Sequence, residues 1–354
     1  CIRDSNTSGF LLAKYYNVHN RLLADLKLLA GDFGEIDSYH NGNPAYPNER
    51  AGSNNSSENN YINTEGTDHF YRLNLRYVLP TGDGAKGPIH KYVVDRRGLL
   101  VPGHESGGRE WNPFTSGRLI AESEFFYRKQ DLDNNPNPFE PETMGVTLAL
   151  EYDNSDFYKN PTSGSRQRIA ISRDWGGLDD TAPWTSVEFE ATKYFSFGAT
   201  ESALQRVLAL NMWWADSPTW DSSSTVKGQQ VFHRPPPFSG ATLGGLDRHR
   251  GYATNRFNDR SGVFYAAEYR HMPDNNPFKS IPYVNTLRIP WWQWVVFAEV
   301  GRVHDEWDLS ELHDDMKWGV GAGIRLDVEG VVVRLDVAKG EEEGQVQMFI
   351  GHTF

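Results

Sequence analysis

The sequence predicts an all-β protein, and specifically a transmembrane antiparallel β-barrel. Apolar residues alternate with polar or small residues along much of the chain, which is the period of a β-strand with two different faces. Aromatic residues make up 13% of the chain, with 11 Trp and 16 Tyr, and such side chains favour membrane–water interfaces. The mean hydropathy is −0.61 and no run of about 18 apolar residues occurs, which excludes a transmembrane helix. Barrel strands remain compatible with these values, because alternation keeps the mean hydropathy low.

The net charge and the cysteine content exclude further classes of partner and of covalent cross-link. The 354 residues carry a formal net charge of −12, with a pI of about 5.4, which argues against a nucleic-acid partner. The one cysteine, Cys1, rules out an internal disulfide. Cys1 has two readings: the lipid-bearing first residue of a processed lipoprotein, or the boundary of a fragment.

The first eight predicted strands are separated by loops rich in Asn, Gly, Ser and Asp. The longest of these loops cover residues 38–66 and 80–113. In chain order, the strands are assigned to residues 10–18, 21–29, 69–79, 117–129, 144–153, 165–175, 186–197 and 205–215.

The last five predicted strands alternate most regularly. They are assigned to residues 262–270, 295–301, 318–326, 331–340 and 346–354, which brings the total to about thirteen. Alternation alone also fits a soluble sandwich. Two features favour the membrane barrel: the strands run nine or ten residues, the length that spans a bilayer, and tryptophans gather at strand ends. Six side chains are expected to face lipid: Val331, Val333, Leu335, Val337, Met348 and Ile350.

Domain organisation is simple, because no linker, repeat or heptad pattern interrupts the chain. We expect residues 1–354 to form a single barrel domain, with residues 219–261 as a long loop within it. This loop contains "RPPPFSGATLGG" followed by "LDRHRGY", and a loop of this length is usually functional or disordered.

Three segments carry a family resemblance. "PPFSGATLGGLDRHRGY" resembles the long sixth loop of the BamA-type outer-membrane barrels (the bacterial surface antigen family), with its Arg-Gly-aromatic tip. "FAEVG" resembles the family's Phe-x-Asp-x-Gly strand, with Glu299 in place of Asp. "EYDNSDFYKNPTSGSR" resembles its strand and Pro-bearing turn. Five predicted strands follow the loop, as in the family, and the resemblance extends from about Thr143 to the end.

The resemblance implies a fold and a location. It implies sixteen strands, a sixth loop folded into the lumen and the outer membrane of a Gram-negative bacterium. No segment resembles a periplasmic polypeptide-binding domain, so a barrel-only member is expected. The C-terminal targeting strand would include Met348, Ile350 and Phe354. With both termini on the periplasmic side, the turn at Val328–Val331 would be periplasmic, and the loops at residues 304–315 and 341–343 would face outward.

The resemblance also implies a function: membrane-protein assembly and insertion, or polypeptide translocation, through the seam between the first and last strands. Expected partners are outer-membrane lipids, lipopolysaccharide, a polypeptide client and partner outer-membrane or periplasmic proteins. A passive porin or small-solute channel is the alternative. An outer-membrane enzyme is a third class, but no nucleophile elbow or carboxylate dyad occurs. We therefore expect no catalytic residues and no cofactor.

Arg250 is the foremost candidate for a functional side chain. In the family, the corresponding Arg folds back into the lumen onto an acidic residue, here Glu299, with Glu268 as a second acceptor. A planar guanidinium suits a carboxylate, Gly251 would let the loop turn tightly against the wall, and Tyr252 would anchor it. The competing interpretation is an Arg exposed on a solvated loop.

Further residues of several kinds fall on the predicted lumen face. Five more residues are expected there: Phe297, Gly301, Arg325, Arg334 and Asp336. They either line a solvated interior or form a network that holds the loop. The segment "VHDEWDLSELHDD" contains two His and several carboxylates, but it matches no metal-ligand spacing, and we expect no metal site.

Overall fold

One antiparallel sheet of thirteen strands dominates the fold. The computed structural model describes residues 8–133, 141–178, 181–226 and 228–351. The strands follow one another in chain order, and each pairs with the next, except that β8 pairs directly with β13. The sheet consists of β1 (Ser8–His19), β2 (Leu22–Ser38), β3 (Ile62–Val78), β4 (Arg118–Leu132), β5 (Glu142–Asp153), β6 (Gly164–Asp174), β7 (Trp184–Ser196), β8 (Ala203–Asp216), β13 (Ser261–Pro273), β14 (Trp292–His304), β15 (Lys317–Val328), β16 (Val331–Gly340) and β17 (Gln345–Ile350).

Every predicted strand has its counterpart in this sheet, and the all-β class is confirmed. The thirteen strands match the number read from alternation, whereas the resemblance implied sixteen. Strand lengths were underestimated, since β2 and β3 have 17 residues each. Their pairing continues through polar residues at which the apolar alternation has ended, from Asp32 opposite Thr67 to Ser38 opposite Ile62. Backbone hydrogen bonds extend these strands where side-chain pattern gives no signal.

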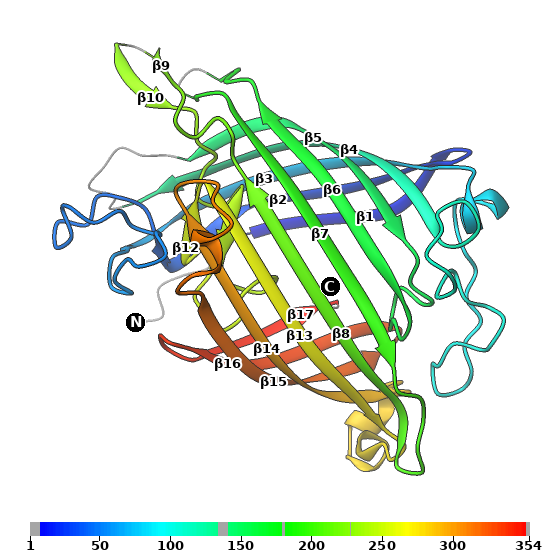
Figure 1. Ribbon diagram of the computed structural model, residues 1–354. Helices are drawn as coiled ribbons and strands as arrows, with labels where there is room; N and C mark the ends of the chain where they lie inside the picture. Colours follow the sequence, from blue (N-terminus) through cyan, green and yellow to red (C-terminus); the bar gives the residue numbers. More distant parts are fainter. Residues whose placement is uncertain (1–7, 134–140, 179–180, 227, 352–354) are drawn as a thin grey trace.

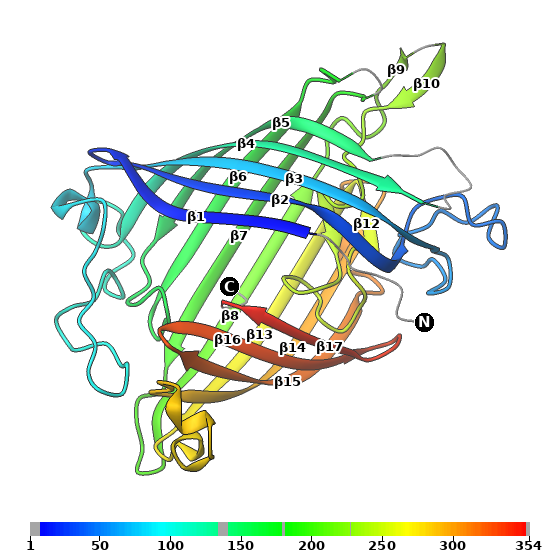
Figure 2. The same cartoon turned by 180° about the vertical axis from the view of Figure 1, so that it is seen from behind.

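The sheet curls into a barrel whose two edges are β1 and β17 (Figures 1 and 2). Within the described residues, no ladder joins these two strands, and Figure 2 shows them apart. β1 and β17 run in the same direction, because an odd number of antiparallel strands connects them. β1 therefore begins at one end of the sheet, and β17 finishes at the other.

The two ends of the barrel differ in their loops. At one end, here the long-loop end, residues 217–260 connect β8 to β13 and contain two small hairpins, β9 (Ser223–Val226) with β10 (Gln229–Phe232) and β11 (Ala241–Leu243) with β12 (Phe257–Asp259). The opposite end, here the turn end, contains the tight turn at Glu329 and Gly330, both with positive φ. The turn end also carries two long connections, residues 79–117 and 274–291.

Residues 79–117 form an ordered cover on the turn end. They contain the 3-10 helix η1 (Gly82–Lys86); η2 (Pro277–Ser280) and η3 (Val284–Thr286) lie in the neighbouring connection, and η4 (Glu311–His313) lies at the other end. The Tyr152 hydroxyl donates to the carbonyl of Ser116, at 3.0 Å. Farther along the cover, Leu99 packs against a buried cluster of Met272, Trp291 and Val332. The cover thus reaches from β5 to β16.

The barrel has an apolar outer face and a polar inner face. Val331, Leu335 and Val337 of β16 are 46%, 44% and 56% exposed, whereas Arg334 and Asp336 between them are buried. Met348 and Ile350 of β17 lie on the outer face as well, and Val333 is partly exposed. Exposed apolar side chains on every second residue are what lipid-facing strands require.

Aromatic side chains mark the two borders of this apolar band. Trp214 and Trp307 pack against each other in a tilted arrangement at the long-loop end, with ring centroids 4.8 Å apart, and Trp294 stacks on His271 at the turn end. Rings with a polar edge suit the level of the lipid headgroups. In the described part of the chain, no helix is long and apolar enough to cross a bilayer.

The facing of β16 leads to a prediction about membrane insertion. Leu335→Arg should cost on the order of 2–4 kcal/mol in folding free energy, because it places a charge against acyl chains. Asn74→Arg is the matched control, since Asn74 lies on the inner face between Asp25 and Glu124. Denaturant titrations in lipid vesicles measure both variants. Equal losses for the two would contradict the assigned faces.

Candidate functional site

Arg250 lies inside the barrel at the tip of the long loop and is fully buried. Its Nε donates to Oε1 of Glu299 at 2.7 Å, and its backbone N–H donates to Oε2 of the same carboxylate at 2.7 Å. Its Nη1 donates to Glu268 at 2.9 Å and to Asp336 at 3.1 Å. Three strands, β13, β14 and β16, therefore each present one carboxylate to a single guanidinium.

Two further arginines complete the charge balance of this cluster. Arg270 of β13 donates from Nε to Glu268 at 2.7 Å. Arg325 of β15 bonds both Glu268 and Asp336. Arg250, Arg270 and Arg325 thus face three carboxylates in an interior that excludes solvent. Charge-assisted hydrogen bonds offset the desolvation of buried ions only when geometry is good and each partner is present.

The loop tip also bonds backbone groups around the cluster. The His249 ring bonds the carbonyl of Lys317 at 3.0 Å, and the Tyr252 hydroxyl donates to the carbonyl of Trp318 at 3.0 Å, both at the start of β15. On β17, the side-chain amide of Gln347 donates to the carbonyl of Arg250 at 3.4 Å. With the carboxylates, these contacts tie the tip to all five strands after the loop.

Close packing fixes the tip as firmly as its polar contacts. The Arg250 guanidinium carbon lies 3.4 Å from the centre of the Phe297 ring, a cation–π contact. A Cβ at Gly251 would come within 2.9 Å of the Gly340 nitrogen and 3.0 Å of the Lys339 carbonyl carbon, so only glycine lets the loop approach β16 this closely. The tight turn itself is made by His249, whose φ is +64°, rather than by Gly251.

The glycines of β15 provide the depression in which the tip region packs. A Cβ at Gly321 would lie 2.3 Å from the Phe297 ring, and one at Gly319 would lie 3.3 Å from the His249 ring. The alternation of these glycines with apolar residues was visible in the sequence. The sequence did not indicate that aromatic rings would pack against the glycine-bearing face of β15.

The remaining predicted residues occupy the following positions. Gly301 lies beneath Leu243 of the loop. A Cβ added at Gly301 would lie 2.9 Å from Cδ1 of Leu243. Arg334 points inward, with Nη2 donating to the carbonyl of Leu246 at 2.6 Å. Met348 and Ile350 are on the outer face, away from the cluster. Phe354 and Cys1 lie outside the described residues.

Sequence reasoning missed a second buried arginine in the loop. Arg256 donates from Nε to Glu342 at 2.8 Å and from Nη2 to the carbonyl of Ser56 at 2.6 Å. Glu342 belongs to the β16–β17 loop, and Ser56 to the β2–β3 loop. Arg256 therefore joins loops from both sides of the open seam. Residues 341–343 were expected only to form an outward-facing loop; local sequence gave no sign of the Glu342 contact, because Arg256 lies 86 residues earlier.

The β2–β3 loop covers the long-loop end. Besides Ser56, it supplies Arg50, which pairs with Asp259, and Asn54, whose amide donates to the carbonyl of Asp315 at 3.2 Å. Among the acidic and histidine residues near Asp315, His313 bonds the Tyr265 hydroxyl at 2.8 Å. In the described part of the chain, no three His, Cys, Asp or Glu side chains gather as metal ligands.

Burial lowers the pKa of His249 from 6.5 to about 4, although its bond to the Lys317 carbonyl favours the protonated form. The imidazole is thus neutral at neutral pH. It is surrounded by the rings of Tyr252, Phe257 and Phe264. A proton on this ring would charge an apolar pocket of the docked loop.

A barrel-shaped antiparallel sheet with an apolar outer band, and with a loop tip bonded to its inner wall, defines a membrane β-barrel with a lumen-inserted loop. The chain belongs to the Omp85 superfamily: residues 53–354 match the Omp85 superfamily domain. No curated protein matches the chain.

Solved structures with a similar fold share little sequence with this chain. BamA from Haemophilus ducreyi lacking POTRA domains 1–3 is 13% identical, with a TM-score of 0.47 over 98% of this chain and 60% of that chain. CdiB from Escherichia coli is 11% identical, with a TM-score of 0.49 over 93% of this chain and 49% of that one. CdiB from Acinetobacter baumannii is 13% identical, with a TM-score of 0.44 over 98% and 49%. The chain spans about half to three-fifths of these structures.

A double-mutant cycle tests the central contact. Arg250→Ala should destabilise the folded barrel by about 3–5 kcal/mol, because it leaves buried carboxylates with less compensating charge. Glu299→Ala should do the same, and the two losses should be far from additive. Unfolding titrations of the four proteins give the coupling energy. Arg248→Ala is the control, since its ion pairs are long, at 3.8 Å; strictly additive losses would refute the contact.

The His249 pKa predicts a pH dependence of loop docking. Below pH 6.5 a released loop binds a proton that the docked loop excludes down to about pH 4. Docking should therefore weaken as the pH falls through this window, by on the order of 3 kcal/mol in total. Protease cleavage within residues 217–260 should accelerate accordingly. His249→Asn keeps a residue that tolerates positive φ and should flatten this pH profile; an unchanged profile would exclude His249 as its source.

Proposed function

We propose that the protein is an outer-membrane barrel of a Gram-negative bacterium that inserts or translocates polypeptides. Membership in the Omp85 superfamily and the apolar outer band support the location. The observation that carries the proposal is the edge of β17, which pairs with β16 on one side and with no strand on the other within the described sheet. An unpaired strand edge is a template for a further strand.

The loop tip supports the edge strand β17 from inside the barrel. In the described part of the chain, β17 contributes six residues to the sheet, from Gln345 to Ile350. The contact from Gln347 to Arg250 connects β17 to the buried cluster. Because β17 is bonded to this cluster, its register can stay fixed while a strand of the client pairs with its open edge.

A passive porin is the alternative function. The buried cluster argues against it, because the side chains of Arg250, Arg270 and Arg325 are 0% exposed, so water does not reach this part of the inner wall. A porin requires a lumen that stays filled with water. Lipids and lipopolysaccharide would surround the outer band, and polypeptide clients would meet the seam.

Reconstitution in vesicles tests the proposal. The protein should accelerate the insertion of an unfolded outer-membrane barrel substrate and give little steady ion conductance. A photoreactive residue at Met348, on the β17 edge strand, should crosslink to the arriving substrate, whereas one at Leu148, equally on the outer face but in mid-sheet, should not. Steady conductance without faster insertion would favour the porin, and equal crosslinking at both sites would reject the seam.

A further inference from the structure

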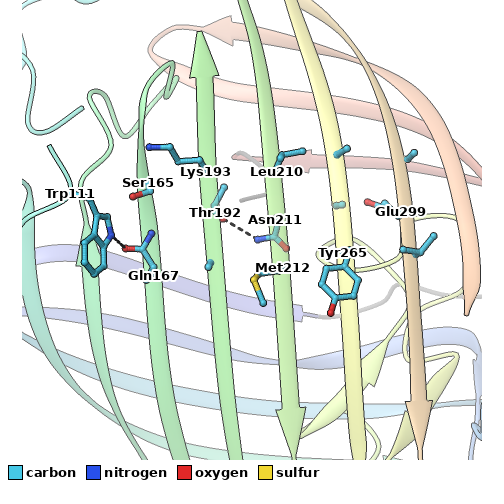
Figure 3. A pocket seen from close by; sticks show the side chains of 15 residues that line it. Trp111, Ser165, Gln167, Thr192, Lys193, Leu210, Asn211, Met212, Tyr265 and Glu299 are labelled. Atoms are coloured by element: carbon cyan, nitrogen blue, oxygen red, sulfur yellow. Dashed lines mark hydrogen bonds between the residues drawn. The ribbon is translucent and has the colours of Figure 1, made fainter. Parts of the chain in front are cut away.

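A hollow lies on the outer wall of the barrel, on the lipid-facing side of β6, β7, β8, β13 and β14 (Figure 3). Its volume is about 660 Å³, within the range of roughly 300–1,000 Å³ that is typical of ligand sites. Two neighbouring cross-strand rows of outer-face residues form it. The first row is Ser165, Lys193, Leu210, Ala267 and Ala298; the second is Gln167, Ala191, Met212, Tyr265 and Val300.

The hollow arises from small side chains in the midst of large ones. Ala191, Ala267 and Ala298 form its floor, where neighbouring outer-face positions carry Leu, Met, Tyr and Val. Leu210 and Met212 are 39% and 40% exposed along its length. Because its lining is largely apolar, a chain of methylene groups would fit against it without leaving polar groups unsatisfied.

Polar groups gather at the end of the hollow nearer the turn end. Ser165 and Lys193 lie directly opposite each other on β6 and β7. Ser165 is 3% exposed and its hydroxyl has no hydrogen-bond partner in the described part of the chain, although it lines the hollow. Lys193 is exposed, and among the described residues it makes no ion pair. The Lys193 ammonium lies 5.9 Å from the centre of the Phe195 ring and meets no described carboxylate. A buried hydroxyl without a hydrogen-bond partner beside such an ammonium is suited to an anionic oxygen ligand.

Trp111 closes this polar end on the β6 side. It comes from the cover of residues 79–117, and its indole N–H donates to the Gln167 side chain at 3.0 Å (Figure 3). The indole also packs edge-on against Tyr152, with ring centroids 5.9 Å apart. Because indole rings favour the headgroup level of a bilayer, Trp111 places Ser165 and Lys193 at the depth at which lipid phosphates lie.

We propose that this hollow is a binding site for one glycerophospholipid. The phosphate accepts hydrogen bonds from the Lys193 ammonium and the Ser165 hydroxyl, and one acyl chain lies over Ala191, Ala267 and Ala298. The occupant is a membrane lipid rather than a soluble phosphate, because the polar end opens into an apolar channel on the membrane face of the barrel. This inference rests on the outer-membrane location in the proposed function.

Native mass spectrometry of the purified, folded protein tests the site. Dioleoyl phosphatidylglycerol and dioleoylglycerol serve as probes that share acyl chains and differ in the phosphate. Lys193→Gln should weaken phosphatidylglycerol binding about tenfold, as the loss of one charge-assisted hydrogen bond predicts, and should leave dioleoylglycerol unchanged. Ala267→Phe, which fills the floor, should weaken binding of both lipids.

Two controls carry the same chemical changes elsewhere. Lys279→Gln removes an exposed ammonium at the turn end, and Ala121→Phe enlarges an exposed outer-face alanine on β4; neither should change lipid binding. Equal lipid binding by all five proteins would overturn the proposal, as would capture of a peptide rather than lipid by a photoreactive residue at Tyr265. Client insertion, measured separately on the same proteins, distinguishes this failure from failure of the proposed function.

Discussion

The interior of this barrel depends on one buried guanidinium. Arg250 bonds carboxylates from three strands, while its neighbours His249 and Tyr252 bond the start of a fourth, and Gln347 brings in the fifth. If the loop leaves, Glu299 loses both of its hydrogen bonds from Arg250, while Glu268 and Asp336 keep only the arginines of the wall. Each lost contact leaves a charge or dipole with less compensation, which is costly in a buried site. The docked loop and the curvature of β13–β17 therefore stabilise each other.

This arrangement makes the two sides of the seam unequal. On one side, β17 is held to the loop tip behind it; on the other, β1 pairs with β2 alone among the strands that the structure describes. At the long-loop end, Arg256 connects the β2–β3 and β16–β17 loops, so the two sides are joined there through side chains rather than through a strand ladder. A seam joined at one end by a few polar contacts separates at lower cost than a continuous ladder.

Much of the fold could be predicted from local pattern, and the rest required long-range pairing. Alternation predicted all thirteen strands and the outward facing of Leu335, because the two-residue period of a strand can be recognised from neighbouring residues in the sequence. The contact of Arg250 with Glu299 was predicted through the family resemblance, supported by the alternation that places Glu268 and Glu299 on the polar faces of their strands. Arg270, Gln347 and the Asp336 contact to Arg250 were not predicted, since cross-barrel distances follow from the curvature of the sheet. The cover at residues 79–117 was also missed, because its Gly- and Pro-rich sequence shows no regular spacing of apolar residues.

Hydrogen–deuterium exchange on the folded barrel, comparing the wild type with Arg250→Ala, tests most directly whether the loop tip holds the C-terminal wall together. The account predicts faster exchange of backbone amides in β13–β17, with amides of β3–β6 unchanged, because the tip bonds the former strands and reaches β7 only through the long ion pairs of Arg248. Faster exchange confined to residues 217–260, with β13–β17 as protected as before, would contradict it: the loop would then rest on a wall that is stable without it.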